Sequence, residues 1–521
     1  PMMIDLHQAA KALIVALRQD EDRGVHCREI NIAAFQHLLG RAEREVDAER
    51  RRQQQGSLAA WRSWIKEAGA DKKGWAHSWS SLKEPWRPTR TRTQSTFTGK
   101  PLDLLKQERT RLTEVWRCSS RRQPPFEAPA GATAELPMLT ADKVQKAAKT
   151  FSRRTAQTWD GFHPRHYSML DHDQLAVVAD LLRFVEEVGL MPSVIQAVYT
   201  RLIPKLKGEL IEQVSMRGIG LLPSLYRLWA RLRQDVARSW EAQHKTPALA
   251  HQAGRSIVET VYLQSLRAES GQLETPVQHS GAFLWDLSNY YEHIDRVLLW
   301  SRSADSGFPL AIVAVSMNQY SARRLIGLES LAMDAFYPER GIAPGCALAT
   351  FWVQVYAYQP LQRWSARHPQ VGGSMFIDDF LGETRDSEPH RVVGRLAAAA
   401  ADLQDQITHE LDCRVALHKS ALVASSDGLL TRLQKAFGKF AGAAKSSTAN
   451  LGVDFFAGRV RAHRKNVNLL RTREGKFARR CRRLLALRRG GYNMRELYCT
   501  GLQAYSHFGA EVVGLDTQQL K

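Results

Sequence analysis

The stretch from Ser374 to Leu381 constrains the fold most, because two consecutive aspartates, Asp378 and Asp379, lie there between short apolar segments. Glycines stand before it, at 372 and 373, and after it, at 382, which is typical of a strand, a tight turn and a second strand. We therefore predict a β-hairpin with the two acids at its tip. Adjacent strand residues point to opposite faces, so the pair needs a carboxylate from elsewhere to form a metal site. Without that partner, a solvated turn is the alternative.

A third carboxylate, Asp286, ends the apolar run 281–286, which predicts a buried strand. Buried strands usually avoid carboxylates, so this acid is either a solvated edge or a ligand. Beside the hairpin, Asp286 and Asp378 would supply the oxygen ligands that hard divalent ions need. Two Mg²⁺ ions, with Mn²⁺ as a substitute, would then clamp an in-line phosphoryl transfer, and Asp379 would support them.

Three cations and a glycine turn accompany these acids. Lys205, Lys207 and Arg217 lie on two short extended segments, the second leading into a helix predicted over 225–240. They could hold a triphosphate, because cationic side chains bind phosphate oxygens, although three exposed cations alone are more simply a solvated face. Gly341 to Gly345 precede an apolar helix, and backbone with little side chain suits close approach of a nucleotide or template.

The charge balance favours a polyanionic partner. The 521 residues include 73 Lys and Arg against 53 Asp and Glu, a net charge of +20, which points to nucleic acid or an anionic membrane surface. No apolar run approaches the roughly 20 residues of a membrane-spanning helix, so nucleic acid is preferred and no membrane partner is expected. The 6 cysteines are scattered without paired spacing, which favours an intracellular, reducing compartment, including the nucleus if the source is eukaryotic.

Basic segments flank the central region. Residues 1–138 predict a helical, basic N-terminal extension that contains a cluster of tryptophans from Trp61 to Trp86. Aromatic and cationic residues together can bind single strands, but the spacing of Trp61 and Trp64 also fits a buried helix face, which we prefer. Arginines recur near the C-terminus and suit a helix that follows a duplex backbone, or else a nuclear-localisation run or a basic tail. They include Arg479, Arg480, Arg482, Arg483, Arg488 and Arg489.

Between about 139 and 454, the order of these motifs resembles that of reverse transcriptases of the non-LTR retrotransposon type. The segments that carry the resemblance are Trp159–Pro164, Leu202–Lys205, Arg217–Ile219, Gln252–Ser256, Asp286–Tyr291, Gly341–Leu348, Phe376–Asp379, Leu417–Ser420 and Asn450–Val453. The resemblance implies an RNA-directed DNA polymerase that uses an RNA template, a DNA primer and dNTPs.

The resemblance also implies a right-hand polymerase of the α+β class. Residues 139–275 would form the fingers, 276–455 a palm whose antiparallel sheet carries the Asp-Asp hairpin, and 456–521 a basic helical thumb. The N-terminal extension, residues 1–138, would precede them. No endonuclease precedes the polymerase in these 521 residues, which leaves open a fragment or a truncated element. The segment after the palm is too short for a ribonuclease H domain.

Individual roles follow from the same resemblance. Asp286, Asp378 and Asp379 would be catalytic metal ligands, and the cations at 205, 207 and 217 would bind the nucleotide phosphates. Tyr291 would exclude a ribose 2′-hydroxyl, and Lys419 would give a proton to the leaving pyrophosphate. Gly345 would lie against the nucleotide, Gly452 in a hairpin that grips the primer, and the C-terminal arginines on the nucleic-acid backbone.

The sequence departs from the family's motifs at two positions, and two alternative functions remain. The turn usually written G-x-P-Q-G lacks its glutamine at Ala343–Gly345, and Gly218 replaces a proline in the fingers motif, so altered fidelity or efficiency is expected. An RNA-dependent RNA polymerase is the enzymatic alternative, against which Tyr291 argues. A non-catalytic, polymerase-like RNA-binding protein is the other, and the intact carboxylates argue against it.

Overall fold

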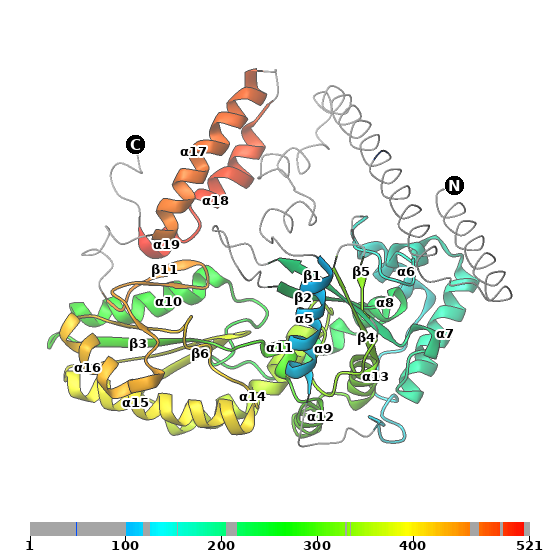
Figure 1. The fold of residues 1–521 in the computed structure, drawn as a ribbon, viewed down its shortest axis with the longest axis horizontal. Helices are drawn as coiled ribbons and strands as arrows, with labels where there is room; N and C mark the ends of the chain where they lie inside the picture. The colour runs from blue at the N-terminus through cyan, green and yellow to red at the C-terminus, as the bar shows by residue number, and fades with distance from the viewer. Residues whose placement is uncertain are drawn as a thin grey trace, which may run out of the picture. The chain divides into compact units, whose positions relative to one another are not determined.

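A computed structural model covers residues 1–521. It describes residue 48 and residues 101–117, 125–153, 155–204, 216–328, 331–333, 335–458, 468–489 and 493–514. The predicted tryptophan cluster lies outside them. Two compact units result: residues 85–478 with 504–521, and residues 1–84 with 479–503. The described residues include many helices and mostly antiparallel sheets (Figure 1), so the predicted α+β class is confirmed.

The larger unit contains a five-stranded sheet in the order β6-β7-β3-β8-β9, here called the central sheet. All neighbours are antiparallel except β8 and β9. Strand β3 lies in the middle and is buried along most of its length, which explains its continuous apolar sequence. The bounds are β3 His279–Asp286, β6 Gly372–Phe376, β7 Asp379–Asp386, β8 Ala421–Ala424 and β9 Ala443–Ala444.

Helices cover both faces of the central sheet (Figure 1). Neighbouring residues of β3 show which helix lies on which face. A Cβ added at Gly281 would meet Leu396 and Leu433, whereas Ala282 joins a cluster with Val261. The first face therefore carries α15, Pro389–Asp405, and α16, Asp427–Phe437, and the second carries α10, Ile257–Ser270.

A second sheet of four strands, in the order β2-β1-β4-β5, belongs to the same unit. Strands β1 and β4 are parallel, and the other pairs are antiparallel. Helix α5 packs on this sheet through Leu104, Leu105 and Leu112. The bounds are α5 Pro101–Trp116, β1 Ala197–Pro204, β2 Met216–Leu221, β4 Arg323–Leu328 and β5 Leu331–Ala332.

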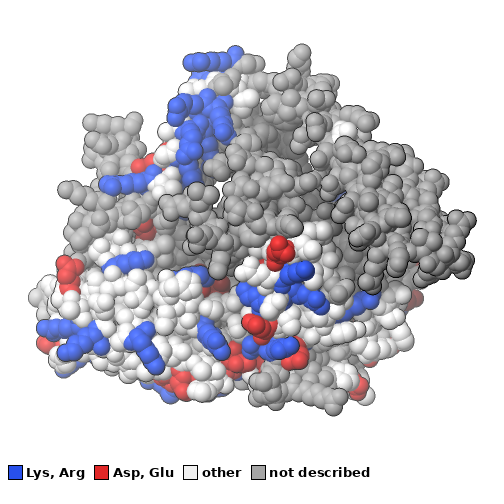
Figure 2. All heavy atoms as spheres, viewed as in Figure 1, with Lys and Arg blue, Asp and Glu red and all other residues white. Residues whose placement is uncertain are grey.

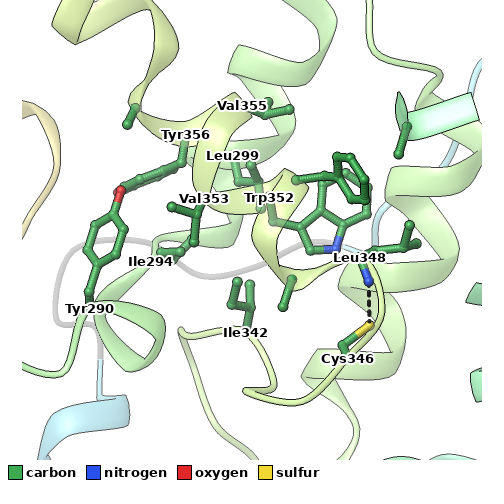
Figure 3. Close-up of a cluster of buried hydrophobic side chains, with 14 of the residues drawn as sticks. Tyr290, Ile294, Leu299, Ile342, Cys346, Leu348, Trp352, Val353, Val355 and Tyr356 are labelled. Carbon is green, nitrogen blue, oxygen red and sulfur yellow. Dashed lines mark hydrogen bonds between the residues drawn. The ribbon is translucent and has the colours of Figure 1, made fainter. Parts of the chain in front are cut away.

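A helical core joins the two sheets. Figure 3 shows how Tyr290 and Ile294, which follow β3, pack with Ile342 and Cys346 of the glycine turn and with Trp352 of α14. This packing fixes the segments around the end of β3. The helices concerned are α6 Ala141–Thr150, α7 His172–Val188, α8 Ser224–Leu232, α9 Gln234–Gln243, α11 Tyr290–His293, α12 Arg296–Asp305, α13 Leu310–Ser321 and α14 Ala349–Arg367.

The helix predicted over 225–240 is in fact two helices, α8 and α9, which meet at Arg233. The buried guanidinium of Arg233 donates to Glu186 and to the Pro137 carbonyl. Trp229 also donates to Glu186, over 2.7 Å. This long-range ion pair fixes Arg233 where a continuous helix was expected, so the prediction of one helix was wrong.

The described part of the smaller unit is helical. Helix α17, Asn468–Arg489, begins in the larger unit, and its residues from Arg479 onward belong to the smaller one. A π-helical turn, Leu497–Gln503, follows, with Leu497 and Leu502 buried. Across the described parts of both units, no helix combines the length and the apolar sequence needed to cross a bilayer.

Candidate active site

The three predicted carboxylates come together at one edge of the central sheet. Asp286 is the last residue of β3 and Asp379 the first of β7, and the two are paired in register. Asp378 lies in the turn between β6 and β7, where its carbonyl accepts a hydrogen bond of 2.8 Å from the Leu287 amide. The predicted hairpin is therefore confirmed, and its tip lies beside the end of β3.

The turn adopts an unusual backbone conformation. Ile377 has a φ of 60°, and β-branched residues rarely occupy this left-handed region. Its amide donates to Nδ1 of His251 over 3.3 Å. The same chain segment pairs with β6, since Ala250 donates to the Met375 carbonyl and Met375 to the Ala248 carbonyl, each over 2.8 Å. The outer edge of the hairpin is therefore held in place.

Charged side chains lie close together around the three aspartates. The Nζ of Lys419 lies 2.8 Å from Oδ1 of Asp286. Although Asp379 keeps an exposed edge, desolvation raises its pKa to about 7, and the charges of Asp378 and Asp286 add to this rise. Burial also raises the pKa of Asp378, with Asp286 adding to the rise and with Lys419 and Arg217 opposing it. Desolvation and repulsion between carboxylates therefore both disfavour full ionisation of Asp378 and Asp379.

Two further predicted residues lie near Asp378. Arg217 is exposed on β2, and its charge acts to lower the pKa of Asp378. Tyr291 is half-buried, and its pKa rises to about 12 because of burial first and the Asp378 charge second. The structure thus brings Arg217 and Tyr291 into the field of the carboxylates.

The glycine turn packs against the segment that carries Tyr291. Gly341 has a φ of 89°, and a Cβ there would lie 2.8 Å from the Glu292 carbonyl, so a side chain is excluded. The amide of Ile342 donates to the Tyr291 carbonyl over 2.9 Å. Gly345 also has a positive φ, 99°, and lies beside β2. The turn therefore connects the Tyr291 segment with the strand of Arg217.

The remaining predicted residues lie further along the chain. Gly452 forms a tight turn with Leu451, with φ values of 80° and 48°, as a two-residue hairpin loop requires. The turn joins β10, Thr448–Asn450, to β11, Val453–Phe455. Lys205 and Lys207 lie outside the described residues. The six predicted arginines lie on α17, where Lys and Arg side chains gather (Figure 2).

A pocket opens beside the carboxylates. Asp286, Asp379 and Lys419 line it on the side of the central sheet. Helix α10 and the β10–β11 hairpin supply further lining residues, as does Ser374 of β6. They are Thr260, Gln264, Thr448, Ala449, Asn450 and Leu451. Neither His251 nor Gln264 was singled out from sequence. Gln264 lies three residues after Val261 on the buried face of α10. A polar residue on the buried face of a helix is the sequence signal that could have identified Gln264.

The three aspartates supply the kind of ligand that a hard divalent ion prefers. Within the ranges that the structure describes, no group of three or more His, Cys, Asp or Glu side chains is arranged to hold a metal ion. Carboxylate oxygens are nevertheless the ligands that Mg²⁺ prefers, and desolvation first and carboxylate repulsion second raise the pKa values of Asp378 and Asp379. Lys419 now occupies one oxygen of Asp286. The three aspartates therefore fit divalent ions by their chemistry.

No protein-family model and no curated protein matches the chain. Among solved structures, the chain is similar to apo telomerase from Candida tropicalis truncated from its C-terminal domain, with 12% identity, a TM-score of 0.38, and coverage of 51% of this chain and 54% of that one. Telomerase from Candida albicans in complex with a TWJ fragment of telomeric RNA gives 13% identity, a TM-score of 0.36, and coverage of 51% and 46%. The chain thus spans about half the length of these telomerases.

Proposed function

We propose that this chain is an RNA-directed DNA polymerase, a reverse transcriptase of the non-LTR retrotransposon type. The observation that carries the proposal is the in-register pairing of Asp286 with Asp379, with Asp378 in the adjoining turn. In this proposal the central sheet belongs to the palm, strands β1 and β2 belong to the fingers, and α17 belongs to the thumb. The motif order in the sequence supports the same assignment.

The carboxylates would bind divalent ions that neutralise charge on the reacting phosphate. Asp286 and Asp378 are the proposed ligands, and Asp379 supports them from the start of β7. Asp378 and Asp379 lie where desolvation makes an unneutralised carboxylate unfavourable, as their raised pKa values indicate. Lys419, whose Nζ lies 2.8 Å from Oδ1 of Asp286, would give a proton to the leaving pyrophosphate.

The other residues would bind and orient the nucleotide. Arg217 offers a planar guanidinium to phosphate oxygens, and its charge acts to lower the pKa of Asp378. The half-buried ring of Tyr291 would occupy the space below the sugar and so exclude a 2′-hydroxyl. Gly341 and Gly345 carry no side chain, and the glycine turn packs against the Tyr291 segment and against β2.

Nucleic acid is the proposed partner because of charge. The net charge of +20 and the arginines of α17 suit an RNA template paired with a DNA primer. The non-catalytic, polymerase-like alternative draws its support from the turn at Ala343–Gly345, which lacks the glutamine of the family's G-x-P-Q-G motif. The three intact carboxylates favour the catalytic function.

The experiment is primer extension on an RNA template in Mg²⁺, with dNTPs or rNTPs supplied separately. We expect incorporation of dNTPs and little of rNTPs. Tyr291→Ala should raise rNTP use by about ten-fold or more relative to dNTP use, because the excluded hydroxyl gains space. Tyr337→Ala, at a 73% exposed tyrosine, is the matched control and should change neither rate.

Two outcomes would contradict the proposal. If the unaltered chain incorporates no dNTP, reverse transcription is excluded. If it incorporates rNTPs as readily as dNTPs, the RNA polymerase alternative replaces it.

A further inference from the structure

One buried amide side chain connects two hairpins of the pocket. Gln264 is 2% exposed on the inner face of α10. Its Nε2 donates to Oγ of Ser374 over 2.8 Å. Its Oε1 accepts from Nδ2 of Asn450 over 2.7 Å. Both ends of the amide therefore bond to side chains on other elements, and all three residues line the same pocket as Asp286 and Asp379.

The two partners lie on the elements that the proposed reaction uses. Ser374 is in β6, four residues before Asp378, and pairs with Leu381 of β7. Asn450 is the last residue of β10 and directly precedes the turn at Leu451 and Gly452. Gln264 thus connects the strand that leads to the Asp-Asp turn with the hairpin assigned to the primer.

The β10–β11 hairpin needs such support. It is a two-stranded sheet of its own, with three residues in each strand, and an isolated hairpin of this kind is marginally stable at best. On its other side, Arg473 donates to the Gly452 carbonyl, and buried Asp454 accepts from the amides of Leu469 and Leu470 at the start of α17. Val453 and Phe455 of the same hairpin also pack in a buried apolar cluster with Leu381 of β7. Side-chain hydrogen bonds therefore add to apolar packing in fixing the position of the hairpin relative to the carboxylates.

We propose that Gln264 is a positioning residue that fixes the β10–β11 hairpin against the Asp378–Asp379 hairpin, and so sets the distance between a primer 3′ end and the carboxylates. This inference rests on the proposed function for its chemical meaning. The hydrogen-bonded link itself is independent of that function. Gln264 touches no reacting atom in this account, so its effect is on geometry.

A purely structural role makes a different prediction. If the buried amide of Gln264 only satisfies hydrogen bonds, its removal lowers the stability of the fold. Activity then falls only in proportion to the folded fraction. A positioning role predicts slower nucleotide addition in fully folded protein, because a displacement of about 1 Å can cost up to about a hundred-fold in rate.

The main variant is Gln264→Met, which keeps the length of the side chain and its helix propensity but removes both hydrogen bonds. We expect the rate of single-nucleotide addition at saturating dNTP to fall between about ten- and a hundred-fold. The affinity for the primer–template should change by less than about two-fold, because backbone charge dominates that affinity. Amide exchange in residues 448–455 should accelerate, while exchange in α13 stays unchanged.

Milder variants keep the test valid if Gln264→Met folds poorly. Ser374→Ala and Asn450→Ala each remove one bond and should each slow addition by less than Gln264→Met. Neither should add to the effect of Gln264→Met, because the shared link is already broken. Ser265→Ala is the matched control, since this neighbouring hydroxyl is buried without a hydrogen-bond partner in the described part of the chain, and it should change neither rate nor exchange.

The outcomes separate the inference from the proposed function. If the unaltered chain extends primers and Gln264→Met matches it in rate and exchange, the inference is wrong. It is equally wrong if the rate falls only in step with the unfolded fraction. If the unaltered chain extends no primer, the proposed function fails, and faster exchange confined to 448–455 would still support the link.

Discussion

Ile377 shows at the scale of one residue how the site is held. A left-handed backbone costs a residue with a Cβ roughly 1–2 kcal/mol. Here it is maintained by the hydrogen bond to His251 and by the pairing of the Asp378 carbonyl with Leu287. Such strain is tolerated where the surrounding structure determines the conformation. The orientation of Asp378 therefore depends on contacts from two neighbouring segments.

The strain leads to a stability prediction. Ile377→Gly should lower the free energy of unfolding by less than about 1 kcal/mol, because relief of the left-handed strain offsets the packing lost by a half-buried side chain. Ile326→Gly, in the middle of β4 and 0% exposed, should cost about 3–5 kcal/mol. Denaturant unfolding of both variants gives the comparison, and equal losses would show that Ile377 is not strained.

At the scale of elements, an ion pair connects α10 to the central sheet. Glu383 of β7 is buried, and Arg267 of α10 binds it. Burial raises the pKa of Glu383 from an ordinary 4.5 to about 7, and Arg267 opposes this rise. Because the folded state binds this proton more tightly than the unfolded state, the contribution of Glu383 to stability falls as pH rises from about 4.5 to about 7.

Glu383→Gln should remove this pH dependence. Between pH 5 and pH 8, the unaltered protein should lose roughly 2–3 kcal/mol more of its unfolding free energy than the variant loses. Denaturant unfolding at the two pH values measures the difference. A variant that parallels the unaltered protein at both pH values would mean that Glu383 titrates near its ordinary pKa.

Elements also show what the sequence could predict. The ends of β3 and the Asp-Asp hairpin were predictable because glycines and apolar runs are local signals. Helix α10 was harder, because it buries Gln264 and Ser265 while Tyr262 and Leu263 stay exposed, the reverse of the usual apolar face. Its buried face depends on partners at Ser374 and Asn450, which are more than 100 residues away.

At the scale of the whole molecule, charge governs the proposed partner. Binding of nucleic acid through phosphate contacts weakens steeply with salt. Replacing Arg482, Arg483, Arg488 and Arg489 of α17 with glutamine should lower the slope of log affinity against log salt by about 3. The matched control replaces four exposed cations elsewhere, at Arg391, Arg432, Lys435 and Lys439, for the same change in net charge. Equal slopes for the two variants would argue against α17 as the nucleic-acid surface.

The central claim is that the carboxylates at the end of β3 and in the adjoining hairpin perform nucleotide addition. Its most direct test is the rate of single-dNTP addition to a primer on an RNA template in Mg²⁺, compared between Asp378→Asn and Asp386→Asn. Asp386 lies at the far end of β7, the strand that follows Asp378, and pairs with Arg395. The first variant should lose about 1,000-fold, since several kcal/mol of charge stabilisation disappear, and the second less than about two-fold. Similar rates for the two variants would contradict the account.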